Sequence, residues 1–162
     1  MELTVEEKKF RNLMVVYFFL FLAGGLSFYI RPEKITHDLI TLGTWLGFAE
    51  FEVAEDRFWV ILSVAMMATI STCCLMASIK VRETRNYVIP VIISKMTSSG
   101  LGMAEFVTQS PHPFHYLVIS LVDFPLFIIA VIYYIRAIRS TGKIGRPVAN
   151  LEKTEIGDPP EI

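Results

Sequence analysis

The chain has 162 residues, of which 53% are hydrophobic, and its formal net charge is −1. Several separate segments are almost entirely apolar, which is unusual for a soluble domain of this length, so the composition indicates an integral membrane protein surrounded by a lipid bilayer. The nearly neutral charge, together with the lack of a basic patch interleaved with aromatic residues, argues against a nucleic-acid partner.

The apolar segments predict four transmembrane helices, at about residues 12–30, 58–79, 87–107 and 114–135. Each holds roughly 19 to 22 residues, which at a rise of 1.5 Å per residue matches a hydrocarbon core of about 30 Å. Backbone groups in lipid must form hydrogen bonds within their own segment, so we expect helices rather than strands. The predicted fold is an all-α membrane protein, in which residues 1–139 form a four-transmembrane-helix bundle.

The connection between the first two predicted spans is long for so small a protein. Its apolar residues recur at intervals of one helical turn, which is the period of one helical face: Ile35, Leu39, Leu42 and Leu46. We therefore predict an amphipathic segment at about residues 33–49, lying on the outer membrane surface or capping the bundle. A re-entrant segment is the alternative.

The distribution of lysine and arginine predicts the orientation in the membrane. Eleven of these residues lie in the N-terminal tail, the second loop and the C-terminal tail, against three in the first loop and none in the third. The positive-inside rule then places both termini in the cytoplasm. A bacterial or archaeal cell membrane is favoured, with an organellar or eukaryotic membrane as the alternative. Residues 140–162 are polar and rich in glycine and proline, so we expect a flexible cytoplasmic tail.

Two charged residues interrupt the third and fourth predicted spans. Lys95 lies roughly 12 Å from the cytoplasmic start of its helix, and Asp123 roughly 13 Å from the outer start of the next. Because these helices run in opposite directions, both residues fall near the midplane of the bilayer. A lone charge there costs about 2.5–3.5 kcal/mol, which pairing offsets in part. We therefore predict a buried Lys95–Asp123 ion pair.

A polar stripe is predicted on the helix that carries Lys95. Ser94, Ser98 and Gly102 recur every fourth residue, a pattern that permits close helix contact, and Glu105 follows three residues later. If this face points inward, it lines a narrow polar seam that opens to the outside.

Three histidines fall on the predicted outer side: His37, His112 and His115. Imidazoles beside the carboxylates of the first loop are ligands for Zn²⁺ or Cu²⁺, but their spacing is not diagnostic. The main expectation is that no cofactor binds. A Zn²⁺ or Cu²⁺ site, and a haem or quinone touching His112 or His115, are alternatives.

The sequence contains no Ser-His-Asp grouping, phosphate-binding glycine loop or nucleotide motif. It favours a non-catalytic membrane protein, either a subunit of a larger complex or homo-oligomer, or a bundle that binds a lipid or small molecule. One alternative is an intramembrane enzyme that uses Lys95, Asp123 and Glu105 as acid–base groups on an apolar substrate. Another is a small transporter or ion pathway along the polar stripe.

Overall fold

The computed structural model describes residues 2–49 and 57–144, and the chain is helical over nearly all of this part, with no strand in it. The elements in chain order are α1 (Val5–Ile30), α2 (Pro32–Trp45), α3 (Arg57–Ile79), α4 (Val81–Thr84), the 3-10 turn η1 (Arg85–Tyr87), α5 (Val88–Thr108) and α6 (Phe114–Ile144). The predicted all-α fold is confirmed.

Helix α1 begins earlier than the apolar segment because a capping box extends it. The Thr4 hydroxyl accepts a hydrogen bond from the Glu7 N–H, and the Glu7 carboxylate accepts one from the Thr4 N–H at 2.7 Å. Both N–H groups would otherwise lack a partner at the helix start. At the other end of the chain, α6 continues to Ile144, so the first residues of the predicted tail are helical. The rest of that tail, 145–162, lies outside the described residues.

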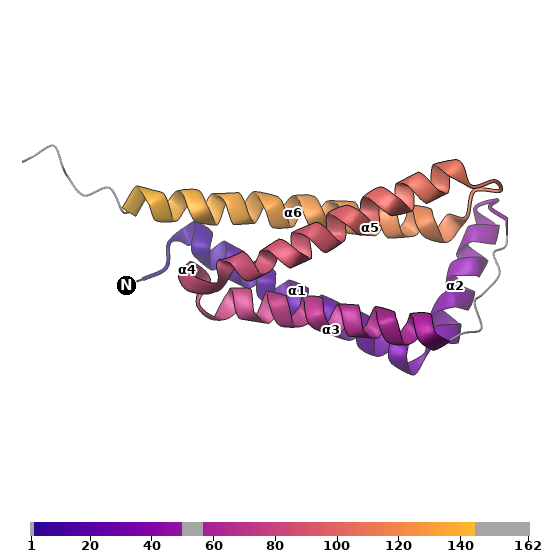
Figure 1. The fold of residues 1–162 in the computed structure, drawn as a ribbon, viewed down its shortest axis with the longest axis horizontal. Coiled ribbons are helices and arrows are strands. Elements are labelled where there is room, and N and C mark those ends of the chain that lie inside the picture. Colours follow the sequence, from indigo (N-terminus) through magenta and orange to yellow (C-terminus); the bar gives the residue numbers. More distant parts are fainter. Residues whose placement is uncertain (1, 50–56, 145–162) are drawn as a thin grey trace, which may run out of the picture.

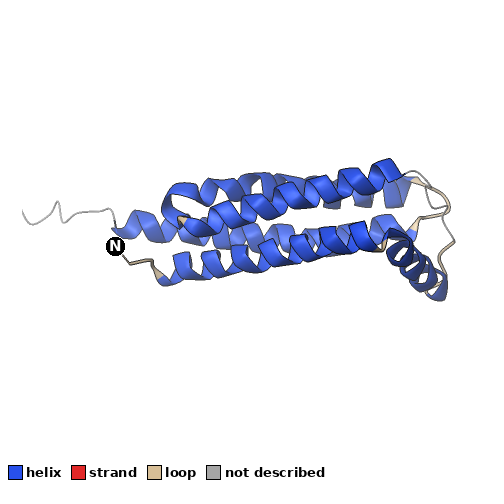
Figure 2. Ribbon diagram, turned by 90° about the horizontal axis from the view of Figure 1, so that it is seen from below, coloured by secondary structure: helices blue, strands red, loops and turns tan. Residues whose placement is uncertain are grey.

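The four long helices α1, α3, α5 and α6 lie lengthwise beside one another, and successive long helices run in opposite directions (Figure 1, Figure 2). The closest neighbours are α1 with α3 and α5 with α6, so the bundle consists of two antiparallel pairs. The N-terminus, α4 and the end of α6 share one end of the bundle, and α2 crosses the opposite end (Figure 1). We call the latter the outer end, after the orientation that the sequence predicts.

The apolar core fills the half of the bundle that is nearer the termini. Its buried members come from all four long helices and from α4: Phe10, Met14, Tyr17, Phe21, Ile70, Cys74, Ala77, Val81, Val88, Val91, Ala130 and Ala137. Towards the outer end the two helix pairs diverge (Figure 1), and several of the buried residues there are small or polar, including Gly25, Ser99, Gly102 and Ser120. The two halves of the bundle are therefore packed differently.

Three helices within the described residues are long and apolar enough to cross a membrane: Val5–Ile30, Phe58–Ile79 and Phe114–Ser140. Large apolar side chains are exposed on their surfaces, among them Phe19 (60%), Ile61 (66%) and Leu121 (61%). Lipid tails are a suitable environment for such surfaces, which is consistent with a multi-pass membrane protein. Helix α5 is not among the three; it carries Lys95, Glu105 and several small residues.

Helix α2 lies within the segment that was predicted to be amphipathic. Gly43 permits close contact with α6, because an added Cβ there would lie 2.9 Å from Cδ1 of Phe114. The helix is followed by a turn in which Gly47 has a φ of +85°, a conformation that glycine adopts without strain. Ile35 and Leu39 are half-buried. Four acidic residues of the first loop, Glu50, Glu52, Glu55 and Asp56, lie outside the described residues.

Candidate functional site

The predicted ion pair is present at the middle of the bundle. Lys95 Nζ lies 2.9 Å from Asp123 Oδ1, and each side chain is 12% exposed. The two residues come from the antiparallel helices α5 and α6, which lie side by side along their length. The match of depths along these two helices, which was worked out from the sequence, is therefore confirmed by the contact.

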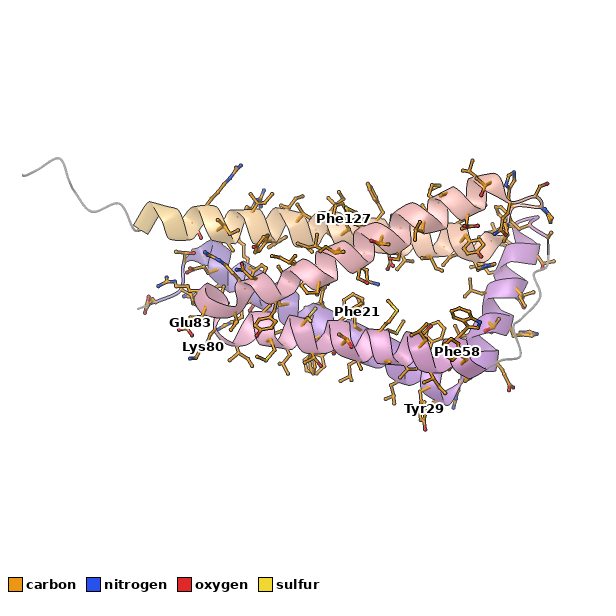
Figure 3. All side chains as sticks on the ribbon, in the orientation of Figure 1. Phe21, Tyr29, Phe58, Lys80, Glu83 and Phe127 are labelled. Atoms are coloured by element: carbon orange, nitrogen blue, oxygen red, sulfur yellow. The ribbon has the colours of Figure 1, made fainter. Side chains whose placement is uncertain are left out.

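Further partners surround both members of the pair. Ser98, one turn after Lys95 on the same face of α5, donates its hydroxyl hydrogen bond to Asp123 Oδ2. Lys95 Nζ lies 4.7 Å from the centroid of the Phe21 ring, which rises from α1 towards α5 (Figure 3). A cation over an aromatic face is attracted by the ring quadrupole, most strongly away from water. The ion pair thus links three helices.

A polar contact fixes α5 against α6 about one turn closer to the outer end. Ser120 Oγ lies 3.0 Å from the carbonyl oxygens of both Ser99 and Tyr116, so its hydroxyl hydrogen bond is satisfied within the seam. A Cβ added at Gly102 would lie 2.8 Å from Ser120 Oγ, which means that only glycine permits this approach. Small residues at a helix contact allow backbones to come close in membranes.

The other members of the predicted stripe lie away from this seam. Ser94 is half-buried, whereas Glu105 is exposed and accepts a hydrogen bond from Gln109 Nε2 at 2.7 Å. Glu105 is ten residues beyond Lys95, which corresponds to about 15 Å along the helix. The structure therefore brings Ser98 to the ion pair and Gly102 to the seam, but does not bring Glu105 to either.

The contact face of α5 follows alternating steps of three and four residues: Val88, Val91, Lys95, Ser98 with Ser99, and Gly102. Steps of three and four residues are those of a helix face that packs against a neighbouring helix. A stripe of every fourth residue through Ser94, Ser98 and Gly102 leaves out Ser99, which is why sequence reasoning missed it; Ser120 lies on α6, where no stripe was predicted. The alternating steps are visible in the sequence and could have identified Ser99.

The three histidines are separately placed. His37 is exposed on α2, and His112 is exposed with Nδ1 2.7 Å from the carbonyl oxygen of Phe106. His115 is half-buried, and its ring centroid lies 4.1 Å from that of Tyr116. Within the described residues, no group of three or more His, Cys, Asp or Glu side chains is arranged to hold a metal ion.

A second ion pair, which the sequence reasoning missed, lies at the end of the bundle that carries the termini. Glu7 is fully buried, and Arg82 of α4 donates to it through Nε at 2.8 Å and through Nη2 at 2.9 Å. This two-pronged geometry suits an arginine and a carboxylate. The hydrogen bond to Glu7 raises the pKa of Arg82. The capping box of α1 was a signal for an ordered Glu7, but nothing in the sequence identified Arg82 as its partner.

Hydroxyl groups also join α1 to its neighbours. Tyr17 donates to the carbonyl oxygen of Leu126 in α6 at 2.8 Å, next to Pro125 inside that helix. Ser71 of α3 donates to the carbonyl oxygen of Phe18 at 3.0 Å. Serine in a membrane helix often bonds its own backbone, so the sequence did not predict the Ser71 contact.

An apolar groove of about 440 Å³ runs along the α1–α3 pair. Its lining consists almost entirely of carbon and comes from both helices: Phe21, Leu22, Gly25, Leu26, Tyr29, Val64 and Ala68. Gly25 lies at its base against Met67, where an added Cβ would be 3.2 Å from the methionine Cβ. The side wall of the bundle therefore has an apolar hollow whose lining includes Phe21, the ring next to the Lys95 ammonium.

Comparison of the chain with known protein-family models, with curated proteins and with solved structures found no match. The chemistry of the site is thus argued from its geometry. Each carboxylate oxygen of Asp123 accepts a hydrogen bond from α5, one from Lys95 and the other from Ser98. The ammonium of Lys95 contacts the Asp123 carboxylate and the face of the Phe21 ring. This arrangement joins α5 to α6 and places the cation of the pair beside α1.

Proposed function

We propose that the protein is a four-span membrane bundle that acts without catalysis and binds a lipid or another small apolar molecule of the bilayer. The observation that carries this proposal is the closed Lys95–Asp123 pair. A catalytic acid or base must reach the proton that it transfers, whereas the groups of this pair are directed at each other, at Ser98 and at Phe21. The apolar groove supports a binding role, since concave apolar surfaces are where small ligands bind.

A fourth span by α5 is part of the proposal. The helix has 21 residues, which at 1.5 Å per residue is about 31 Å, close to the thickness of a hydrocarbon core. It runs antiparallel to α6 between the same two ends of the bundle (Figure 1). Its one buried cation is paired, so the cost of placing it in lipid is reduced. Both termini then face the cytoplasm, with α2 at the outer surface.

Labelling of single cysteines tests the number of spans. In a background with Cys73 and Cys74 replaced by serine, Thr84→Cys and Gln109→Cys mark the two ends of α5. We expect an impermeant maleimide added outside intact cells to label Gln109→Cys and to spare Thr84→Cys. Labelling of both positions from the same side would contradict the fourth span.

Native mass spectrometry of gently extracted protein tests the binding role. We expect a discrete mass above the 18.4 kDa of the chain, equal to that of a lipid or another small molecule. An added mass equal to a second protein chain would instead support a subunit role. A bare chain, under conditions that preserve lipid adducts on a control membrane protein, would refute the proposal.

A further inference from the structure

The apolar groove continues into charged surface at the outer end of α1. It shares Tyr29 with a second groove of about 490 Å³ and Leu26 with a third of about 440 Å³. Both of these contain Arg31 and Lys34 at the junction of α1 and α2. Tyr29 and Leu26 therefore connect the apolar groove to the two neighbouring grooves that carry the cationic groups.

The cationic end of this surface falls at the depth of lipid phosphates. Phe21 is at the level of Lys95, which lies close to the midplane of the bundle. Arg31 is ten residues further along α1, or about 15 Å, which is half the thickness of a ~30 Å hydrocarbon core. Tyr29 is 70% exposed just before this level and points away from the bundle (Figure 3), as expected of an aromatic residue at a membrane interface.

The charges at this end have a pattern that fits a particular headgroup. The third groove carries Arg31, Lys34 and Asp38, and Lys34 and Asp38 are one turn apart on α2. Across the described part of the chain, none of these three residues forms an ion pair. This arrangement complements a headgroup with a phosphate and an ammonium group, because the two cations attract the phosphate and the carboxylate attracts the ammonium.

The headgroup, rather than the acyl chain, must provide the selectivity. Lipid tails in the bilayer are as apolar as the groove. An acyl chain that moves from the bilayer into the groove therefore gains packing contacts but little hydrophobic free energy. Charged hydrogen bonds to Arg31, Lys34 and Asp38 distinguish one headgroup from another. A primary ammonium donates such a bond to a carboxylate, whereas a quaternary ammonium has no N–H to donate.

We propose that this surface binds one phospholipid with a primary-ammonium headgroup. An acyl chain lies between Phe21 and Tyr29, the phosphate contacts Arg31 and Lys34, and the ammonium donates to Asp38. This inference rests on the proposed function, in that the bundle must bind a lipid of its own bilayer, and it adds the headgroup, the depth and the residues that bind it.

The test is native mass spectrometry of the full chain in detergent with equal amounts of phosphatidylethanolamine and phosphatidylcholine that carry the same acyl chains. We expect about tenfold more phosphatidylethanolamine adduct, the ratio that one charge-assisted hydrogen bond provides. Asp38→Asn is expected to abolish this preference, and Arg31→Gln with Lys34→Gln to weaken retention of both lipids. Equal retention of the two lipids by the wild-type chain would overturn the inference, as would unchanged retention by the Arg31 and Lys34 double variant.

Matched controls separate this inference from the function on which it rests. Lys8→Gln with Arg139→Gln removes the same charge at the opposite end and should leave lipid retention unchanged. Ala68→Phe fills the apolar groove, whereas Ala65→Phe enlarges an exposed position on the same helix outside it. Adducts that lack headgroup preference but disappear in Ala68→Phe would refute the headgroup assignment and leave the proposed function standing. If neither added lipids nor the native membrane yield an adduct, the proposed function itself fails.

Discussion

The buried pair allows a sharp prediction about the stability of the bundle. Lys95→Met leaves the Asp123 carboxylate with Ser98 as its remaining partner, and Asp123→Leu leaves the Lys95 ammonium over the Phe21 ring. Because each side chain is only 12% exposed, water replaces the lost partner poorly. Removing one partner of a buried pair lowers the free energy of unfolding by about 3–5 kcal/mol. The remaining charged group can become neutral by gaining or losing a proton, which limits the loss, so we expect about 3 kcal/mol for each single change.

The double variant should behave differently from either single variant. With both charges replaced by apolar side chains, no group is stranded, and we expect the free energy of unfolding to fall by no more than about 1 kcal/mol. Two single losses of about 3 kcal/mol and a double loss of at most about 1 kcal/mol give a coupling energy of at least about 5 kcal/mol, beyond what independent sites show. The measurement is reversible unfolding in mixed micelles with increasing denaturing detergent, with Leu101→Met at an exposed position of α5 as the matched control.

Two results would refute this reasoning. Additive losses in the double variant would mean that the two charges act independently. An unchanged stability in Lys95→Met would mean that the contact contributes nothing. The same double variant also bears on function. If it folds as well as the wild-type protein but its biological phenotype is lost, the pair has a chemical role, and the intramembrane enzyme or ion pathway becomes the better interpretation.

The remaining predictions concern packing at the two ends. Arg82→Gln should lower the unfolding temperature in detergent by several degrees because it removes the cationic partner of a fully buried carboxylate. Lys80→Gln, which breaks an exposed ion pair, should leave that temperature unchanged, and equal effects of the two changes would contradict this. Gly102→Ala should lower the free energy of unfolding by about 1–3 kcal/mol because the new Cβ meets Ser120 Oγ. Gly100→Ala, with open space around the new Cβ, should leave the free energy of unfolding unchanged or raise it slightly. An unchanged stability in Gly102→Ala would show that α5 and α6 are less tightly packed than in the structure.

Depth along the membrane normal can be worked out from the sequence alone. The apolar segments predict where each long helix begins and ends, and the fixed rise per residue then sets the level of every side chain along it. That one coordinate was enough to predict that Lys95 and Asp123 meet, since they lie at similar depth on consecutive antiparallel helices. The helical fold follows with it, because backbone groups in lipid have no partner outside their own helix.

Rotation of each helix and the distances between helices depend on the tertiary structure. Whether Ser94 or Ser99 faces α6 depends on how the side chains of both helices interdigitate. In a soluble protein the polar face of a helix shows which side points outward, but a helix in lipid has no such face, so its rotation cannot be predicted from the sequence in this way. The Glu7–Arg82 contact joins residues far apart in the chain, and the apolar groove is lined by residues of both α1 and α3. Such features arise from the fit of several helices at once, so no single segment of the sequence contains them.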